Sequence, residues 1–266
     1  SVRLAYEVSA AMFTPKIAYM DPAQSSFNLI KGPRTALADL DPLWTPDGKR
    51  RAIFTNKEGT TNIFRQMADG SGGLERLTPA NEYIHAPMSW SSDGKLLAFT
   101  ETTTSDTDIW VLRLADHKAQ PFLRTPSYEG APEFSPDGHW LAYMSEESGH
   151  REVYVQPYPG PGGKSQISID GGVEPMWNHN GRELFYRNGD KMMAVDITTQ
   201  PAFSAGKPKM LFEGRYLRAG TTFPYYDVTA DGQRFLMVKP VEQEQAAPTQ
   251  INVVLNWFEE LKRRVP

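Results

Sequence analysis

The chain has 266 residues, 39% of them hydrophobic and 23% charged, which is enough material for one large globular domain or two small ones. Its 28 Lys and Arg residues face 32 Asp and Glu, and no basic run is present, which excludes nucleic acid as an expected partner. The absence of Cys excludes disulfides, thiolate metal sites and thiol nucleophiles. The longest apolar stretches fall far short of the roughly 20 residues of a membrane-spanning helix, so no membrane insertion is expected.

An aromatic residue followed by a tight turn recurs along the chain. The turn ends in Asp-Gly or Asn-Gly, which supplies the positive φ and the side-chain hydrogen bonds of a hairpin. Successive copies are 46, 44, 43 and 51 residues apart, a spacing that suits one four-stranded blade of a β-propeller. A shortened copy at residues 13–15 brings the number of anchors to six. The other five copies begin at Trp44, Trp90, Phe134, Trp177 and Val228.

Each turn leads directly into a short apolar strand, and a third and a shorter outer strand follow. Second strands are expected at residues 17–19, 52–54, 96–99, 141–143, 184–186 and 235–238. Third strands are expected at residues 62–64, 108–112, 152–155 and 193–195, and outer strands at 75–77, 121–123, 166–168 and 210–212. The sequence therefore predicts an all-β fold: a six-bladed propeller with four-stranded antiparallel blades, forming a single domain over residues 1–266.

The last blade lacks a fourth strand in sequence order. Residues 251–255 would supply only its third strand, so residues 2–6 are expected to complete it. Pairing of the N- and C-terminal strands would then close the ring and remove an exposed edge. Residues 257–264 are expected to form a short helix that ends in cationic residues, which suit the C-terminal dipole.

The repeated phrase aromatic-Ser/Thr-Pro-Asp-Gly-Lys, followed by an apolar strand and by a strand that begins Asp/Asn-Ile-aromatic, resembles the TolB-like β-propeller repeat. The resemblance covers residues 13–255 and is closest to propeller regions of bacterial kinase-associated proteins. It implies a module that binds proteins or small ligands, in an extracytoplasmic or periplasmic setting. The segments that carry the closer resemblance are residues 129–138, 158–164, 184–190 and 252–261.

Carboxylates precede the anchors of four repeats, on the segments that approach the innermost strands. Residues one, three or five positions before each anchor are expected to share one orientation and to converge on the central channel. Ca²⁺, which takes six to eight oxygen ligands, is a candidate occupant; a water-filled polar vestibule is the alternative. These carboxylates are Asp39, Asp41, Glu129, Glu133, Glu174 and Asp227.

Aromatic residues and one histidine lie on the same approaches. Together with Asp39, the four tyrosines form a candidate ligand-binding rim, although ordinary packing between blades explains them equally well. His85 lies five residues before Trp90 and is a candidate base or ligand, with a structural hydrogen bond as the alternative. The tyrosines are Tyr83, Tyr128, Tyr225 and Tyr226.

The sequence contains no nucleophile-elbow, zinc-helix or phosphate-loop motif. The favoured function is therefore a monomeric binding or sensing module that holds a small polar ligand, a peptide or a protein at the channel mouth. The main alternative is a Ca²⁺-dependent hydrolase of the lactonase or esterase type, with a glycosidase as a third possibility. In the hydrolase, Glu129 or His85 would activate water, and the metal ligands would be Asp41, Glu133, Glu174 and Asp227.

Overall fold

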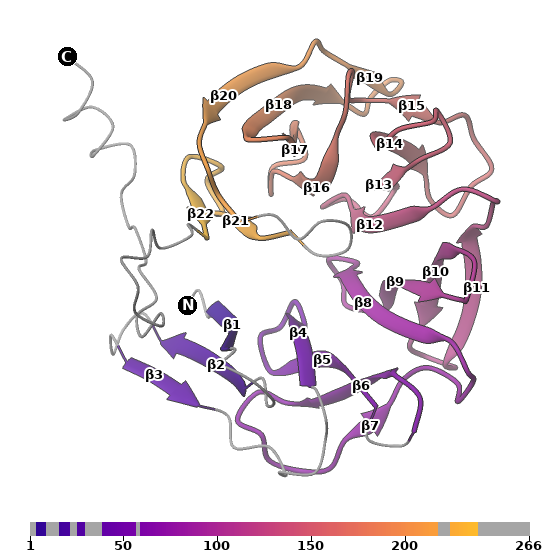
Figure 1. The fold of residues 1–266 in the computed structure, drawn as a ribbon, viewed down its shortest axis with the longest axis vertical. Coiled ribbons are helices and arrows are strands. Elements are labelled where there is room, and N and C mark those ends of the chain that lie inside the picture. Colours follow the sequence, from indigo (N-terminus) through magenta and orange to yellow (C-terminus); the bar gives the residue numbers. More distant parts are fainter. Residues whose placement is uncertain are drawn as a thin grey trace. The chain divides into compact units, whose positions relative to one another are not determined.

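The computed structural model describes the strands Leu4–Val8, Lys16–Asp21 and Ser26–Leu29, and then residues 39–56, 59–217 and 224–238. These residues form 22 strands and no helix, so none of the described segments is a helix that could cross a membrane (Figure 1). The predicted all-β class is confirmed. The shortened copy at residues 13–15, the strand at 251–255 and the helix at 257–264 lie outside the described residues.

The first compact unit, Ser1–Phe134, contains three antiparallel sheets among its described residues. Their strand orders are β1-β2-β3, β4-β5-β6-β7 and β11-β10-β9-β8, so the two complete sheets have the predicted four strands (Figure 1). Strand β12 packs against β8 and β9. The strands are β1 (Leu4–Val8), β2 (Lys16–Asp21), β3 (Ser26–Leu29), β4 (Asp39–Trp44), β5 (Arg50–Thr55), β6 (Asn62–Met67), β7 (Glu75–Arg76), β8 (Ile84–Trp90), β9 (Leu96–Thr102), β10 (Thr107–Arg113), β11 (Lys118–Leu123) and β12 (Glu129–Phe134).

The N-terminal strand β1 pairs antiparallel with β2, with Leu4 opposite Met20 and Val8 opposite Lys16. This pairing places β1 in the first sheet of the chain. The predicted partner of the N-terminal segment, residues 251–255, lies outside the described residues. Closure of a ring by the two termini therefore stays a prediction.

In the second compact unit, Ser135–Pro266, β16, β17 and β18 form a sheet in sequence order. The outer edge of β18 pairs with both β19 and β20. β13, β14 and β15 also pair consecutively, and β21 pairs with β22. The strands are β13 (Trp140–Ser145), β14 (Glu152–Pro157), β15 (Ser165–Gln166), β16 (Val173–Trp177), β17 (Glu183–Asn188), β18 (Lys191–Thr198), β19 (Ser204–Ala205), β20 (Lys209–Glu213), β21 (Tyr226–Val228) and β22 (Phe235–Met237).

The Asp-Gly turns form because each Asp side chain holds the turn in place. In the turn at residues 45–50, Asp47 Oδ1 accepts hydrogen bonds from Thr45 Oγ1 at 2.6 Å and from the Lys49 amide at 3.0 Å. Gly48 then takes a φ of +66°, which favours glycine. Asp93, Asp137 and Asp231 make the same pair of bonds in their own turns.

Neighbouring turns also contact one another within each unit. A Cβ added to Gly94 would lie 3.6 Å from Pro46, and one added to Gly232 would lie 2.3 Å from the Asn178 amide. Gly94 and Gly232 therefore have a second role: the missing side chain leaves room for the turn of the preceding repeat. Because such contacts link consecutive repeats, packing in each unit proceeds from neighbour to neighbour.

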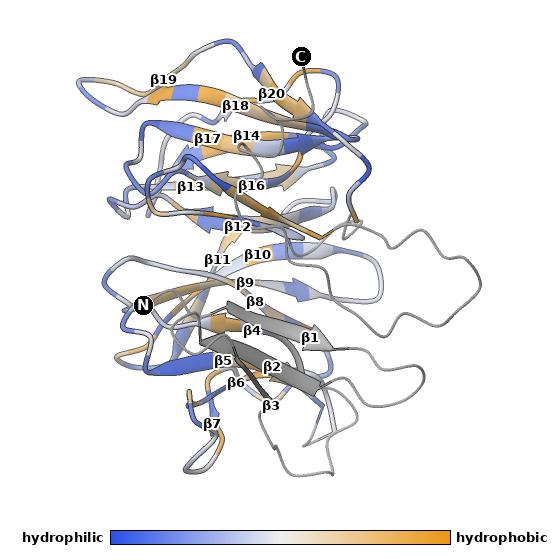
Figure 2. Ribbon diagram, turned by 90° about the vertical axis from the view of Figure 1, so that its left-hand side faces the viewer, coloured by the Kyte–Doolittle hydropathy of each residue, from blue (hydrophilic) through white to orange (hydrophobic). Residues whose placement is uncertain are grey.

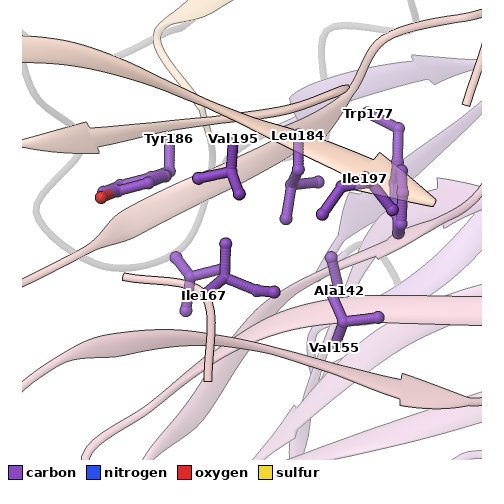
Figure 3. Packing of buried hydrophobic residues seen from close by; sticks show 9 residues of the cluster. Ala142, Val155, Ile167, Trp177, Leu184, Tyr186, Val195 and Ile197 are labelled. Carbon is purple, nitrogen blue, oxygen red and sulfur yellow. The ribbon is translucent and has the colours of Figure 1, made fainter. Parts of the chain in front are cut away.

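The hydrophobic cores lie between sheets, while the loops are more hydrophilic (Figure 2). In the second unit, side chains of β16–β18 such as Trp177 and Val195 face Ala142, Val155 and Ile167 (Figure 3). A corresponding cluster in the first unit contains Ala52, Ile63, Leu77, Trp90, Leu97, Phe99 and Leu112. The anchors Trp90, Phe134 and Trp177 are buried, so they act as core residues.

Candidate functional site

Three of the inner strands, β4, β8 and β16, contain a β-bulge that the sequence analysis does not predict. Pairing with the neighbouring strand is interrupted on β4 between Leu40 and Leu43, on β8 between Pro87 and Ser89, and on β16 between Val173 and Met176. A proline lies at each interruption, because proline has no N–H for the ladder and is tolerated in sheets at bulges.

These bulges break the alternation of side chains. Glu174, which directly precedes Pro175 within the β16 bulge, has a φ of +57°. The expectation that residues one, three and five positions before each anchor share an orientation is therefore wrong for β8 and β16. A bulge inserts one residue, so every position before it faces the opposite side.

Three titratable side chains form a row across the β8–β9–β10 sheet. His85 on β8 lies opposite Glu101 on β9, and Glu101 lies opposite Asp108 on β10. Directly opposite residues of an antiparallel sheet share a face, and all three are buried. Asn81, on the loop that leads into β8, joins them. We refer to His85, Glu101, Asp108 and Asn81 as the His85 cluster.

Hydrogen bonds hold the His85 cluster together. His85 Nε2 lies 2.9 Å from Glu101 Oε2, and Asn81 Nδ2 donates to the same oxygen at 3.3 Å. The side-chain oxygen Oδ1 of Asn81 in turn accepts a hydrogen bond from the Tyr83 backbone amide at 3.1 Å. The cluster therefore fixes the loop that carries Tyr83, which is itself half-buried.

Burial favours the neutral form of His85. Desolvation lowers the pKa of His85 below its ordinary value and outweighs the opposing hydrogen bond to Glu101. A carboxylate only accepts hydrogen bonds, so Nε2 carries the proton and Nδ1 is the free acceptor of the neutral ring. Among the described residues Nδ1 is buried without a donor. As a base, His85 would have to act through this buried nitrogen.

The carboxylate of Asp108 has the least complete set of polar partners in the His85 cluster. Its Oδ2 lies 3.6 Å from Arg124 Nε, while its buried Oδ1 has no partner among the described residues. Burial raises the pKa of Asp108, and the neighbouring Asp106 and Glu101 charges add to this effect. Like charges directly opposite in a sheet repel, which makes the charged form of Asp108 less favourable.

The remaining candidates of the first unit lie on or beside β12. Glu129 is fully buried and accepts a hydrogen bond from Thr125 Oγ1, whereas Glu133 and Tyr128 are half-buried. Thr125 also supports Asp108 through its backbone amide. The structure thus connects Glu129 to the neighbourhood of the His85 cluster by way of Thr125. For Asp39 and Asp41 it describes the backbone of β4 alone.

Glu174, Tyr225, Tyr226 and Asp227 lie in the second unit. The Tyr226 hydroxyl donates to the Glu174 carbonyl oxygen at 2.7 Å, and the Tyr226 ring packs in a core cluster with Phe185. Asp227 retains solvent access, yet desolvation by the surrounding protein raises its pKa despite the opposing Val228 amide. Tyr225 is exposed. The Tyr226 hydrogen bond thus links the segment of Tyr225, Tyr226 and Asp227 to Glu174 on β16.

Among the described residues, no group of three or more His, Asp or Glu side chains is arranged to hold a metal ion. The four predicted ligands are divided between the two units, with Asp41 and Glu133 in the first and Glu174 and Asp227 in the second. Their convergence on one cation stays a prediction.

A family model for the TolB beta propeller domain matches residues 78–225, which is more than half of the chain. The chain belongs to the TolB β-propeller family. Its sequence is 27% identical over 131 residues to the Tol-Pal system protein TolB of Anaeromyxobacter dehalogenans, which covers 48% of this chain and 29% of that protein. This TolB-family chain thus matches less than a third of the length of that relative.

Solved structures show the same fold for the TolB-family chain. TolB from Acinetobacter baumannii superposes with a TM-score of 0.67 at 18% identity, over 86% of this chain and 55% of that one. An oligogalacturonate lyase in complex with manganese superposes with a TM-score of 0.59 at 12% identity, over 87% and 66% of the two chains. At these identities the likeness concerns the fold alone.

Sequence reasoning missed the buried acids of this TolB-family chain at strand ends. Glu101 is the second-last residue of β9, Asp108 is the second residue of β10, and Glu152 begins β14. Glu152 is fully buried and accepts hydrogen bonds from Ser168 Oγ and from the Gly171 amide. The available signal was a polar residue at the start of each third strand, Asn62, Asp108 and Glu152, just before an apolar run.

Proposed function

We propose that this TolB-family chain is a binding module that uses the loops leading into its inner strands to hold a protein or peptide partner, or a small polar ligand. Exposed apolar side chains at three such entries support the proposal most directly, with Ile84 as the first residue of β8 and Ile169 and Tyr225 on the loops before β16 and β21. Ile84, Ile169 and Tyr225 are 46%, 64% and 43% exposed, although each stands close to the start of an inner strand. Exposed apolar residues on rigidly held loops are typical of protein-binding surfaces.

Hydrogen bonds hold these loops in position. Asn81 supports the loop before Ile84, and buried Glu152 accepts the Gly171 amide beside Ile169. The buried polar groups thus serve the conformation of the loops, and preorganised loops lower the entropic cost of binding.

The proposal includes a closed ring of six blades, because only closure would gather these loops on one face. It also includes an extracytoplasmic location, for which the similarity to a Tol-Pal system protein is the support. Cell fractionation of the natural protein tests the location. A cytoplasmic protein would contradict that part of the proposal.

Affinity capture with paired variants tests the binding surface. The triple variant Ile84→Ser, Ile169→Ser, Tyr225→Ser should lose a partner that the native chain retains, because each change removes exposed apolar contact area. Met210→Ser is the matched control, since Met210 is 55% exposed on the outer strand β20. A partner lost equally from both variants, or retained by both, would contradict the proposed surface.

The second candidate function is a Ca²⁺-dependent hydrolase. Its support is the set of carboxylates on the segments that approach the inner strands, because carboxylate oxygens are the ligands that Ca²⁺ prefers. Asp41, Glu133, Glu174 and Asp227 would form the ligand set, with Glu129 or His85 activating water.

Melting temperatures in CaCl₂ and in EDTA, together with turnover of a lactone and an aryl ester, separate the two functions. Chelator-sensitive turnover that Asp227→Asn removes would favour the hydrolase. No calcium-dependent shift and no turnover would eliminate it and leave the binding module.

A further inference from the structure

Arg187 is the largest fully buried side chain of the described residues and carries a charge that nothing described neutralises. It lies near the end of β17, opposite Val173 on β16 and Met192 on β18. No carboxylate among the described residues forms an ion pair with it. A guanidinium stays charged in proteins, so Arg187 cannot escape the cost of burial by losing a proton.

The hydrogen bonds of Arg187 to the described residues use two of its five donors. Nη1 donates to the Leu217 carbonyl oxygen and Nη2 to the Gly189 carbonyl oxygen, both at a long 3.3 Å. Nε is buried without a partner among the described residues. Since a guanidinium has five N–H groups, three have no acceptor within the described part of the chain, one of them on Nε.

The surroundings of Arg187 favour a single negative charge. Phe185, two residues earlier on the same face of β17, belongs to an apolar cluster with Tyr226 and Val228. The Tyr216 ring lies 5.9 Å from the guanidinium carbon. One positive charge in such surroundings is balanced by a monoanion, whereas a dianion would leave excess charge buried.

We propose that Arg187 anchors a binding site for a carboxylate-bearing ligand. The Nε–H and an Nη–H lie along one edge of the guanidinium. They can donate two parallel hydrogen bonds to the two oxygens of a planar carboxylate. The ligand reaches this edge by displacing residues 214–217, whose side chains are exposed or half-buried. Two backbone bonds hold this covering stretch, from the Gly214 amide to Asp190 and from the Leu217 amide to Val238.

Thermal unfolding of the whole chain in sodium acetate, against sodium chloride at equal ionic strength, tests the site. Acetate should raise the melting temperature of the native chain in a saturable manner, because a ligand that binds only the folded state stabilises it. Arg187→Lys should weaken the apparent affinity for acetate about tenfold, since lysine keeps the positive charge but lacks the two parallel N–H donors of the guanidinium. Arg187→Met should remove the response, and the exposed Arg182→Met should keep it.

Arginine Nε–H resonances in a ¹⁵N-labelled native chain provide a second measurement that does not depend on folding of the methionine variant. One resonance, absent from Arg187→Lys, should move with acetate and stay in place with chloride. An equal effect of the two salts, an acetate response that persists in Arg187→Met, or no moving resonance would overturn the proposal and leave Arg187 as a link between two backbone carbonyls.

Discussion

His85 and Glu101 face one another across the β8–β9 register, with Nε2 of the imidazole 2.9 Å from Oε2 of the carboxylate. Both are buried at the end of the sheet where the loop through Asn81 enters β8. The pair thus links β9 to the start of β8. Its hydrogen bond stabilises a loop position that neither residue would fix alone.

Glu101→Ala should destabilise the chain by about 1–3 kcal/mol, because it leaves the buried Nε2–H of His85 and the Asn81 amide without their acceptor. Urea unfolding measures the change. Glu82→Ala, at an exposed position of the neighbouring loop, is the control and should stay within about 0.5 kcal/mol of the native chain. Equal effects of the two substitutions would show that the pair contributes nothing.

The burial of His85 predicts a pH dependence of stability. Its pKa is lower in the folded chain than its ordinary value of about 6.5, so the unfolded chain binds the proton more readily. The contribution is fully present above about pH 6.5 and is lost as the pH falls through the lowered folded value. Melting temperatures at pH 7.5 and 5.5 should differ less for His85→Gln than for the native chain. An identical difference in both chains would contradict the assignment.

The turn aspartates predict a separate loss of stability in acid. The hydrogen bond from Ser91, with that from the Lys95 amide, lowers the pKa of Asp93 to about 2. Its contribution is present above the ordinary value near 4 and disappears as the pH falls toward 2. Asp93→Asn keeps a side-chain oxygen for the turn but does not titrate, so its acid unfolding curve should be shallower. Unchanged steepness would argue against a role for the carboxylate.

Gly232→Ala should be more destabilising than Gly138→Ala. Both glycines have a positive φ, at +70° and +73°, which costs an alanine about 1–2 kcal/mol. A Cβ at Gly232 would also lie 2.3 Å from the Asn178 amide, whereas one at Gly138 meets nothing within 4 Å. The difference between the two variants in urea unfolding isolates the contact between turns. If the two values agree, Asn178 moves aside without cost.

The repeat by itself determined the fold class and the position of the strands. The turn phrase predicts a hairpin at each Asp-Gly, because only a few residue types adopt its backbone conformation, and the apolar runs after it predict the buried strands. Trp90, Phe134 and Trp177 are accordingly found buried. These features depend on neighbours in the sequence, which is why one sequence suffices to find them.

Only the tertiary structure decided which polar side chains meet. Pairing of β8, β9 and β10 brings His85, Glu101 and Asp108 into one row, although 23 residues separate the first from the last. The bulges of β8 and β16 reverse the orientation that simple alternation assigns, and burial leaves Arg187 without a described counter-charge. Register and desolvation arise from packing between distant segments, so a pattern of residue types along the chain does not contain them.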